Sequence, residues 1–256
     1  AASDVYKRQI PTPGVAFLTR TLGADAGVVI SASHNPHYDN GVKFFTNTGG
    51  KLSDELELEI EALLDQPMAC VEPDMVGHVM RIDDATERYF KHCVAAYDGP
   101  DLNGVHIVLD CAHGAAYKVA PRVLVHLGAT VSTLGIHPNG FNINDKVGST
   151  HLETLSAAVL ERKADFGIAL DGDADRCLMV DRQGRQLDGD DLLFIIAKDR
   201  HARNELKGPV VGTLMSNLGL EQALDKLGIE FLRAKVGDRY VLEMLGKHGG
   251  MLGGET

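Results

Sequence analysis

Short apolar runs alternate with longer amphipathic stretches along most of the chain. Near the N-terminus, the runs at residues 26–31 and 42–45 predict two short buried strands, and residues 51–64 place leucines and an isoleucine at helical spacing. A further helix is expected over residues 84–97. Asp98-Gly99-Pro100 then interrupts the pattern with turn-forming residues, so we expect a first domain to end near residue 98.

From Gly104 onward, strands and helices alternate more regularly. A helix is expected between residues 150 and 163, and Thr150 and Glu153 fit a capping box at its start. Apolar runs predict strands at residues 105–110, 129–135, 165–170 and 177–181.

Lys207-Gly208-Pro209 marks a second boundary, beyond which the strand, helix, strand order repeats. Short parallel strands with crossover helices imply sheets that helices cover on both faces. The sequence therefore predicts an α/β fold whose tandem domains contain mixed, mostly parallel sheets. The expected domains are residues 1–98, 99–207 and 208–256. Residues 1–9 do not resemble a first strand, and the last four residues stand where a strand would deliver a loop, so we expect a chain truncated at both ends.

Composition excludes several broad classes of function. Hydrophobic residues make up 44% of the 256 residues and charged residues 24%, which is typical of a globular protein. With 25 Lys and Arg against 36 Asp and Glu, the net charge of −11 argues against a nucleic-acid partner. No apolar run reaches the ~20 residues of a membrane span and no secretory signal opens the chain, so we expect a cytoplasmic protein without a membrane partner. The four cysteines lack metal-binding spacing, and we expect reduced, mostly buried thiols.

An acidic loop, residues 171–176, follows the predicted strand at 165–170. Asp171, Asp173 and Asp175 alternate within it, and three carboxylates so close together are tolerated most readily around a hard cation such as Mg²⁺. An EF-hand is excluded because its sixth and twelfth positions are arginines here. A phosphatase of the haloacid dehalogenase type, in which Asp171 would be phosphorylated, stays open, as does a solvated acidic turn.

A second polar loop, Ser31-Ala32-Ser33-His34-Asn35-Pro36, follows the predicted strand at 26–31 and is called the Ser33 loop below. Asn35-Pro36 accounts for a turn but not for two serines and a histidine in front of it. Serine can act in phosphoryl transfer as a nucleophile or, once esterified, as a phosphate carrier. The G-x-S-x-G elbow of serine hydrolases is not present around Ser33.

These two loops resemble those of the α-D-phosphohexomutases. In that family T/S-A-S-H-N-P is the phosphoserine loop and D-G-D-x-D-R the magnesium loop, and both stand complete here. The family's sugar-selecting loop, G-E-x-S-G-H, has begun at Gly254-Glu255. The stretches YDNGVKFF, PNGFNIN, VGTLMSNLGLE and AKVGDRYV resemble the phosphoglucosamine mutase branch. The resemblance covers nearly everything from Pro11 onward.

The resemblance implies four domains around one cleft, of which the fourth is absent here. It implies an isomerase that converts glucosamine 6-phosphate to glucosamine 1-phosphate through a sugar bisphosphate, feeding UDP-N-acetylglucosamine and cell-wall synthesis in the bacterial cytoplasm. Without the fourth domain to grip the substrate's second phosphate, this chain alone is expected to show little or no mutase turnover. A phosphomannomutase or phosphoglucomutase of the same fold, and an inactive metal- or phosphate-binding fragment, stay open as alternatives, and a homodimer is also left open.

The resemblance also assigns roles to individual residues. Ser33 would carry the phosphoryl group, Lys43 would transfer a proton or steer the phosphate, and His34 would assist beside the nucleophile. The ligands of one Mg²⁺ would be Ser33, Asp171, Asp173 and Asp175, and the phosphate- or substrate-binding residues would be Arg176, Asn35 and Glu255. Simpler roles stay open for three of these: a solvated lysine, a histidine that holds its loop, and an arginine in a local salt bridge. Ala174 stands where these mutases usually have glycine, and His113 is expected to be structural.

Overall fold

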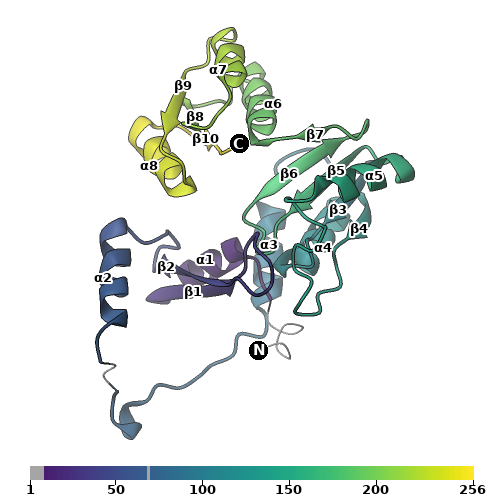
Figure 1. Ribbon diagram of the computed structural model, residues 1–256. Helices are drawn as coiled ribbons and strands as arrows, with labels where there is room; N and C mark the ends of the chain where they lie inside the picture. Colours follow the sequence, from purple (N-terminus) through teal and green to yellow (C-terminus); the bar gives the residue numbers. More distant parts are fainter. Residues whose placement is uncertain (1–8, 68–69) are drawn as a thin grey trace.

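Three α/β units follow one another along residues 9–67 and 70–256, the part of the chain that the computed structural model describes (Figure 1). None of the helices in this part combines the length and apolar character of a membrane span. The elements of the first unit are α1 (Thr12–Thr21), β1 (Ala26–Ser31), β2 (Gly41–Thr46), α2 (Asp54–Leu64), the 3-10 helix η1 (Pro73–Met75) and α3 (Ala85–Ala95).

The strands β1 and β2 form a two-stranded antiparallel sheet, in register from Ala26 opposite Thr46 to Ser31 opposite Gly41. Because successive side chains of a strand point to opposite faces, only one face packs against α1. Val28, Ile30, Val42 and Phe44 are exposed on this sheet. The expectation of buried strands is therefore wrong for these four residues. The leucines of α2 are also exposed, although they follow helical spacing as expected.

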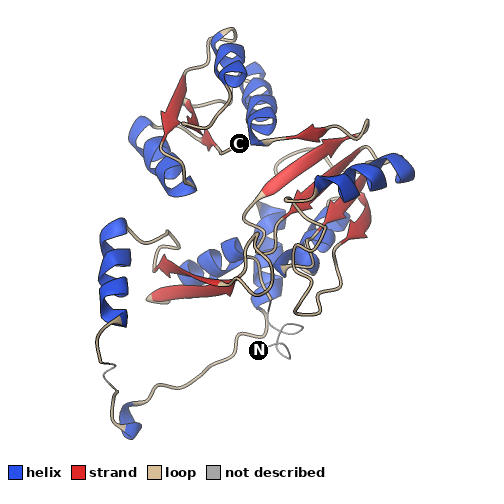
Figure 2. Cartoon of the chain, viewed as in Figure 1, coloured by secondary structure: helices blue, strands red, loops and turns tan. Residues whose placement is uncertain are grey.

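The second unit is built on a mixed five-stranded sheet in the order β4-β3-β5-β6-β7 (Figure 2). The strand β3 pairs in parallel with β4 and β5, whereas β6 pairs antiparallel with both β5 and β7. The α/β class and the mixed sheet expected from the sequence are thus present. The elements are β3 (His106–Asp110), η2 (Ala115–Tyr117), α4 (Val119–His126), β4 (Thr130–Leu134), α5 (Leu152–Arg162), β5 (Phe166–Leu170), β6 (Cys177–Asp181) and β7 (Gln186–Leu187).

Helices cover both faces of this sheet. On one face, Leu155 and Val159 of α5 join a core with Val108 and Val180, and on the other face Leu109 packs in a cluster with residues of η2 and α4. Since β3 and β5 are parallel neighbours, the loops that follow them emerge at the same edge. The helix α5 does not begin with the expected capping box, because His151 is its N-cap residue and makes no side-chain capping bond.

The third unit contains a parallel three-stranded sheet in the order β10-β8-β9. Leu193 and Ala197 of α6 pack in its core with Val210 and Leu224. The boundary expected between residues 207 and 208 would separate α6 from this core, so we propose to move it to the N-terminal side of that helix. The elements are α6 (Gly189–Ala202), β8 (Val210–Thr213), α7 (Leu218–Asp225), β9 (Phe231–Ala234), α8 (Asp238–His248) and β10 (Leu252–Gly253).

All four cysteines are free, in line with the expected reduced state. Their expected burial is wrong for two of them, since Cys70 and Cys177 are exposed and only Cys111 is fully buried.

Candidate active site

The Ser33 loop and the acidic loop lie against each other. The Oγ atom of Ser33 is 3.3 Å from Oδ2 of Asp171 and 3.1 Å from Oδ1 of Asp173. The main chain reinforces this contact, because the N–H of Gly172 donates to the carbonyl oxygen of Ser33 at 3.0 Å. Two motifs that are far apart in the sequence therefore form one site.

The Ser33 loop holds its serine in an unusual backbone conformation. Ser33 has a φ of 52°, in the left-handed region that costs most residues about 1–2 kcal/mol. Two local bonds stabilise the turn: the N–H of Ser33 donates to Oγ of Ser31, and the N–H of Asn35 donates to the carbonyl of Ala32. The turn directs the Ser33 hydroxyl toward the acidic loop.

The acidic loop packs too closely for larger residues. A Cβ atom on Gly172 would lie 2.4 Å from Cδ1 of Ile143 and 2.5 Å from the carbonyl oxygen of Ser33, so glycine is required there. Ala174 has a φ of 57°, which explains why glycine suits this position. Oδ1 of Asp171 accepts the main-chain N–H groups of Asp175 and Arg176, which closes the loop.

The three carboxylates form a compact acceptor set, with one oxygen from each lying within 4.8 Å of the others. Burial and then the charges of Asp173 and Asp175 raise the pKa of Asp171 to about 7. Burial alone would also raise the pKa of Asp173, but hydrogen bonds from Lys43 and Thr12 outweigh it and hold that pKa below its ordinary value. This excess of negative charge, all of it on oxygen atoms, fits a hard divalent cation such as Mg²⁺.

Lys43 lies between the carboxylates and the serine. Its Nζ is 2.7 Å from Oδ2 of Asp173, 2.8 Å from Oδ2 of Asp175 and 3.5 Å from Oγ of Ser33. Burial would lower the pKa of Lys43, but its bonds to the two aspartates outweigh this effect and raise the pKa. The side chain is thus a fixed positive charge beside the serine hydroxyl.

Asp171 itself has no exposed surface. A phosphorylated aspartate must be reached by its substrate, so this burial disfavours the phosphatase alternative. The contacts of His34 support neither an assisting role nor a loop-holding role, since its Nδ1 is buried and has no hydrogen-bond partner within the described residues.

Arg176 and Glu255 line one cavity of about 680 Å³ between the second and third units. Oε1 of Glu255 accepts the main-chain N–H of Gly237 at 2.7 Å, which fixes the carboxylate at the start of α8. Cys177 and Met215 line the same cavity. The structure therefore brings Arg176 and Glu255 to a common space, with Asp175 of the acidic loop at its wall.

Three functional positions escaped the sequence reasoning. Thr12 donates from Oγ1 to Oδ2 of Asp173 at 2.8 Å and from its N–H to the carbonyl of Asp173, so the N-terminus of α1 faces this carboxylate. Asn144 binds the Ser33 loop from the second unit, and Asp110 organises the loop that carries Asn144. Thr12 and Asn144 belong to stretches that resemble the family, but neither stretch indicates its distant partner.

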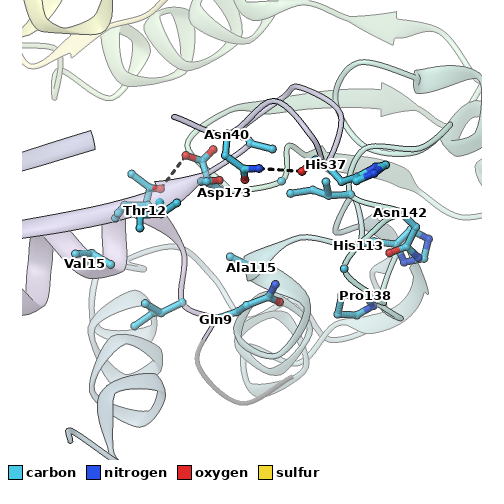
Figure 3. A pocket seen from close by; sticks show the side chains of 18 of the residues that line it. Gln9, Thr12, Val15, His37, Asn40, His113, Ala115, Pro138, Asn142 and Asp173 are labelled. Carbon is cyan, nitrogen blue, oxygen red and sulfur yellow. Dashed lines mark hydrogen bonds between the residues drawn. The ribbon is translucent and has the colours of Figure 1, made fainter. Parts of the chain in front are cut away.

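A second cavity, of about 400 Å³, extends from Thr12 and Asp173 to His113, Pro138 and Asn142 (Figure 3). Nδ1 of His113 accepts the main-chain N–H of His137 at 3.1 Å. This bond ties two segments of the second unit together and is consistent with the structural role expected of His113.

The first and third units also contact each other directly. Lys51 and Asp238 form an ion pair at 2.7 Å. Arg239 donates to the carbonyl of Leu52 at 3.0 Å and pairs with Asp54 of α2. The N-terminus of α8, which fixes Glu255, is therefore tied to the unit that carries Ser33.

Comparison with protein families gives three matches, in chain order. The profiles described as phosphoglucomutase/phosphomannomutase alpha/beta/alpha domains I, II and III match residues 3–69, 87–184 and 188–256, respectively. Among curated proteins, the phosphoglucosamine mutase of Methylococcus capsulatus is 62% identical over 247 residues, which cover 96% of this chain and 55% of that protein. The phosphoglucosamine mutase of Photobacterium profundum is 58% identical over 257 residues, covering 100% and 58%. The chain thus spans a little over half the length of these relatives.

Solved structures show the same fold. A putative phosphomannomutase from Thermus thermophilus superposes with a TM-score of 0.83 at 28% identity, covering 97% of this chain and 57% of that one. An N-acetylphosphoglucosamine mutase from Aspergillus fumigatus, solved with GlcNAc-6P and magnesium, superposes with a TM-score of 0.67 at 19% identity, covering 93% and 61%. At that identity the second likeness concerns the fold alone.

Proposed function

Since the chain belongs to the phosphoglucomutase/phosphomannomutase family, we propose that it carries the phosphoryl-transfer site of a phosphoglucosamine mutase. The reaction is the interconversion of glucosamine 6-phosphate and glucosamine 1-phosphate. The observation that carries the proposal is the cluster in which Ser33 Oγ lies within 3.5 Å of Asp171, Asp173 and Lys43. A hydroxyl that lies between carboxylates suited to bind a metal ion and a fixed ammonium group is suited to accept and return a phosphoryl group.

In the proposed reaction, phosphorylated Ser33 gives its phosphoryl group to the free hydroxyl of the sugar phosphate. The bond between Ser33 Oγ and phosphorus breaks and a sugar oxygen–phosphorus bond forms. The sugar hydroxyl gives up its proton and Ser33 Oγ gains one, so that a serine hydroxyl and a sugar bisphosphate result. The other phosphate of this bisphosphate then returns to Ser33, leaving the isomeric monophosphate. Bound Mg²⁺, held by Ser33, Asp171, Asp173 and Asp175, would supply neutralising charge to the phosphoryl oxygens.

Further side chains of the protein are proposed to transfer a proton and to bind the phosphate and the sugar. The protonated Lys43 faces Ser33 Oγ and can donate a proton to this oxygen as it leaves phosphorus. Its raised pKa keeps the ammonium charged, which favours phosphate steering over proton abstraction. Donation remains feasible because the alkoxide that leaves phosphorus is a stronger base than an amine. Arg176, Asn35 and Glu255 remain the proposed phosphate- and sugar-binding residues, and the cavity shared by Arg176 and Glu255 supports this assignment. His34 keeps a proposed assisting role beside the serine.

Sugar specificity distinguishes this proposal from a phosphomannomutase or phosphoglucomutase of the same fold. Identities near 60% to phosphoglucosamine mutases favour the amino sugar. The resemblance also supports a cytoplasmic location and supply of glucosamine 1-phosphate for cell-wall synthesis.

A single-turnover assay provides the test of the proposed sugar specificity. A version of the chain extended by the fourth domain of its relatives and phosphorylated on Ser33 should lose its phosphate to glucosamine 6-phosphate at least about tenfold faster than to mannose 6-phosphate or glucose 6-phosphate. Equal rates would contradict the proposed specificity.

A further inference from the structure

The side chain of Asn144 crosses from the second unit to the Ser33 loop. Its Nδ2 donates to the carbonyl oxygen of Ser33 at 2.8 Å and to that of Asn35 at 2.9 Å. The residue is 6% exposed, so these bonds form away from bulk water. Both hydrogens of the amide are committed to the main chain of the loop that presents the Ser33 hydroxyl.

Asn144 is itself held firmly. Its N–H donates to the carbonyl of Ala112 at 2.9 Å. The carboxylate of Asp110, fully buried at the end of β3, accepts the N–H groups of Ala112 and Gly148 at 2.9 and 2.8 Å. Asn144 has a φ of 58°, a left-handed conformation that asparagine adopts more readily than most residues. The main chain of Asn144 is therefore anchored to the segment that directly follows β3, an interior strand of the five-stranded sheet.

The orientation of this amide comes at a cost. Oδ1 of Asn144 is buried and has no hydrogen-bond partner within the described residues. Turning the amide over would set Oδ1 against the carbonyl oxygens of Ser33 and Asn35, which is repulsive. A buried acceptor without a hydrogen-bond partner destabilises the folded state. The observed orientation nevertheless keeps both N–H groups of the amide bonded to the Ser33 loop.

The carbonyl of Ser33 receives a second donor, the N–H of Gly172. Gly172 lies between Asp171 and Asp173, so one carbonyl group links the serine both to the acidic loop and to Asn144. These bonds hold Ser33 in its left-handed conformation independently of what its hydroxyl carries.

We propose that Asn144 is a positioning residue for phosphoryl transfer at Ser33. Its amide fixes the Ser33 loop so that the hydroxyl keeps its place against Asp171 and Asp173. The inference rests on the proposed function, because it requires Ser33 to carry the phosphoryl group. Displacement of a reacting group by about 1 Å can slow a reaction roughly 100-fold, so loss of this grip should be visible in the transfer rate.

Asn144→Asp is the most direct variant, since it keeps size and backbone preference but replaces the donor with a carboxylate oxygen facing two carbonyls. Asn142→Asp is the matched control. It adds the same charge to the same loop, keeps the oxygen that accepts the N–H of Asn139, and loses only the bond to the carbonyl of His137. The measurement is the rate of Ser33 phosphorylation by glucose 1,6-bisphosphate at saturating Mg²⁺, made in the chain extended by the fourth domain of its relatives, with amide hydrogen exchange of Asn35 and Gly172 recorded in parallel.

Asn144→Asp should slow phosphorylation of Ser33 by roughly 10- to 100-fold and speed exchange of the Gly172 amide, while Asn142→Asp stays within about twofold of the wild type. If Asn144→Asp does not fold, Asn144→Gly removes the same donor while accepting the left-handed backbone, and the same slowing is expected. Faster exchange without slower phosphorylation would show a purely structural role and overturn the inference. So would equal slowing in both aspartate variants. If the wild type gains no phosphate on Ser33, the proposed function falls and the inference falls with it.

Discussion

The hydroxyl of Ser33 donates a hydrogen bond to Oδ1 of Asp173 across 3.1 Å, although 140 positions separate the two residues in the sequence. The contact joins the loop after β1 to the loop after β5, and hence the first unit to the second. It places a group able to carry phosphate against carboxylates able to hold Mg²⁺. Each of the predictions below perturbs one part of this arrangement or of the framework around it.

Lys43→Met should separate metal binding from phosphoryl transfer. Without the ammonium, Asp173 and Asp175 no longer share their charge with Lys43, so Mg²⁺ should bind roughly threefold to tenfold more tightly. Transfer to Ser33 should nevertheless slow by roughly 100-fold, because a preorganised charge is lost. Calorimetry and single-turnover kinetics check the two effects. The exposed Lys198 offers a control substitution, Lys198→Met, that should change neither. Weaker Mg²⁺ binding with unchanged transfer would contradict the assignment.

The acidic loop should make stability depend on pH in the absence of Mg²⁺. The pKa of Asp171, about 7 in the folded chain, lies above its ordinary value of 3.8. Between these values the folded chain binds more protons than the unfolded chain, so the contribution of Asp171 to stability falls as pH rises from about 4 to 7. The slope should approach about 1 kcal/mol per pH unit within this window.

Urea unfolding of the wild type and of Asp171→Asn between about pH 4.5 and 8 tests this dependence, and the variant should show a flatter profile. Since Mg²⁺ requires the ionised carboxylate, adding it should stabilise the wild type more at pH 8 than at pH 6. Equal stabilisation at both values would indicate that Asp171 does not take part in metal binding.

Ala174→Gly should stabilise the protein. The left-handed conformation of Ala174 costs about 1–2 kcal/mol, which glycine would relieve. The greater conformational freedom of glycine in the unfolded chain offsets about 0.4–1 kcal/mol of that gain in stability. We therefore expect the free energy of unfolding to rise by up to about 1 kcal/mol. The same substitution at the exposed Ala157, within α5, should lower it by about 0.5–1 kcal/mol. A loss of stability at both positions would show that the loop does not hold Ala174 under strain.

The placement of the third unit against the first can be tested by zero-length cross-linking. Lys51 and Asp238 lie 2.7 Å apart, so a carbodiimide should join them, and peptide mapping should recover the pair. Lys51→Arg should keep the charge but remove the cross-link. The local pair of Lys91 and Glu87 on α3 serves as an internal standard. Cross-linking of that pair without cross-linking of Lys51 to Asp238 would contradict the observed arrangement of the units.

The sequence predicted those parts of the fold that depend on local pattern. The run DFGIAL predicted a strand at residues 165–170, and β5 spans Phe166–Leu170, because an apolar run bounded by a turn specifies its own ends. Burial was less predictable. Val28 and Ile30 are as apolar as a core strand, yet their exposure depends on which elements pack on each face, and no local pattern encodes that. The capping box at Thr150 failed in a similar way, since the chain enters α5 through His151 instead.

In the candidate site, too, the local motifs were predictable from the sequence and the contacts between distant residues were not. Ser33 and the three aspartates belong to contiguous motifs, so the sequence could indicate both loops and their chemistry. Thr12 and Asn144 act through partners 161 and 111 positions away, and such contacts exist only once the units have assembled. The sequence therefore indicated the candidate reacting groups but not the residues that hold them in place.

The central claim is that Ser33 carries the phosphoryl group. The most direct test is to incubate the chain, extended by the fourth domain of its relatives, with Mg²⁺ and glucose 1,6-bisphosphate and to measure its mass and the modified peptide. The account predicts a gain of about 80 Da located on Ser33, and no gain in Ser33→Ala. An unmodified wild-type chain, or phosphate located on Asp171 in place of Ser33, would contradict it.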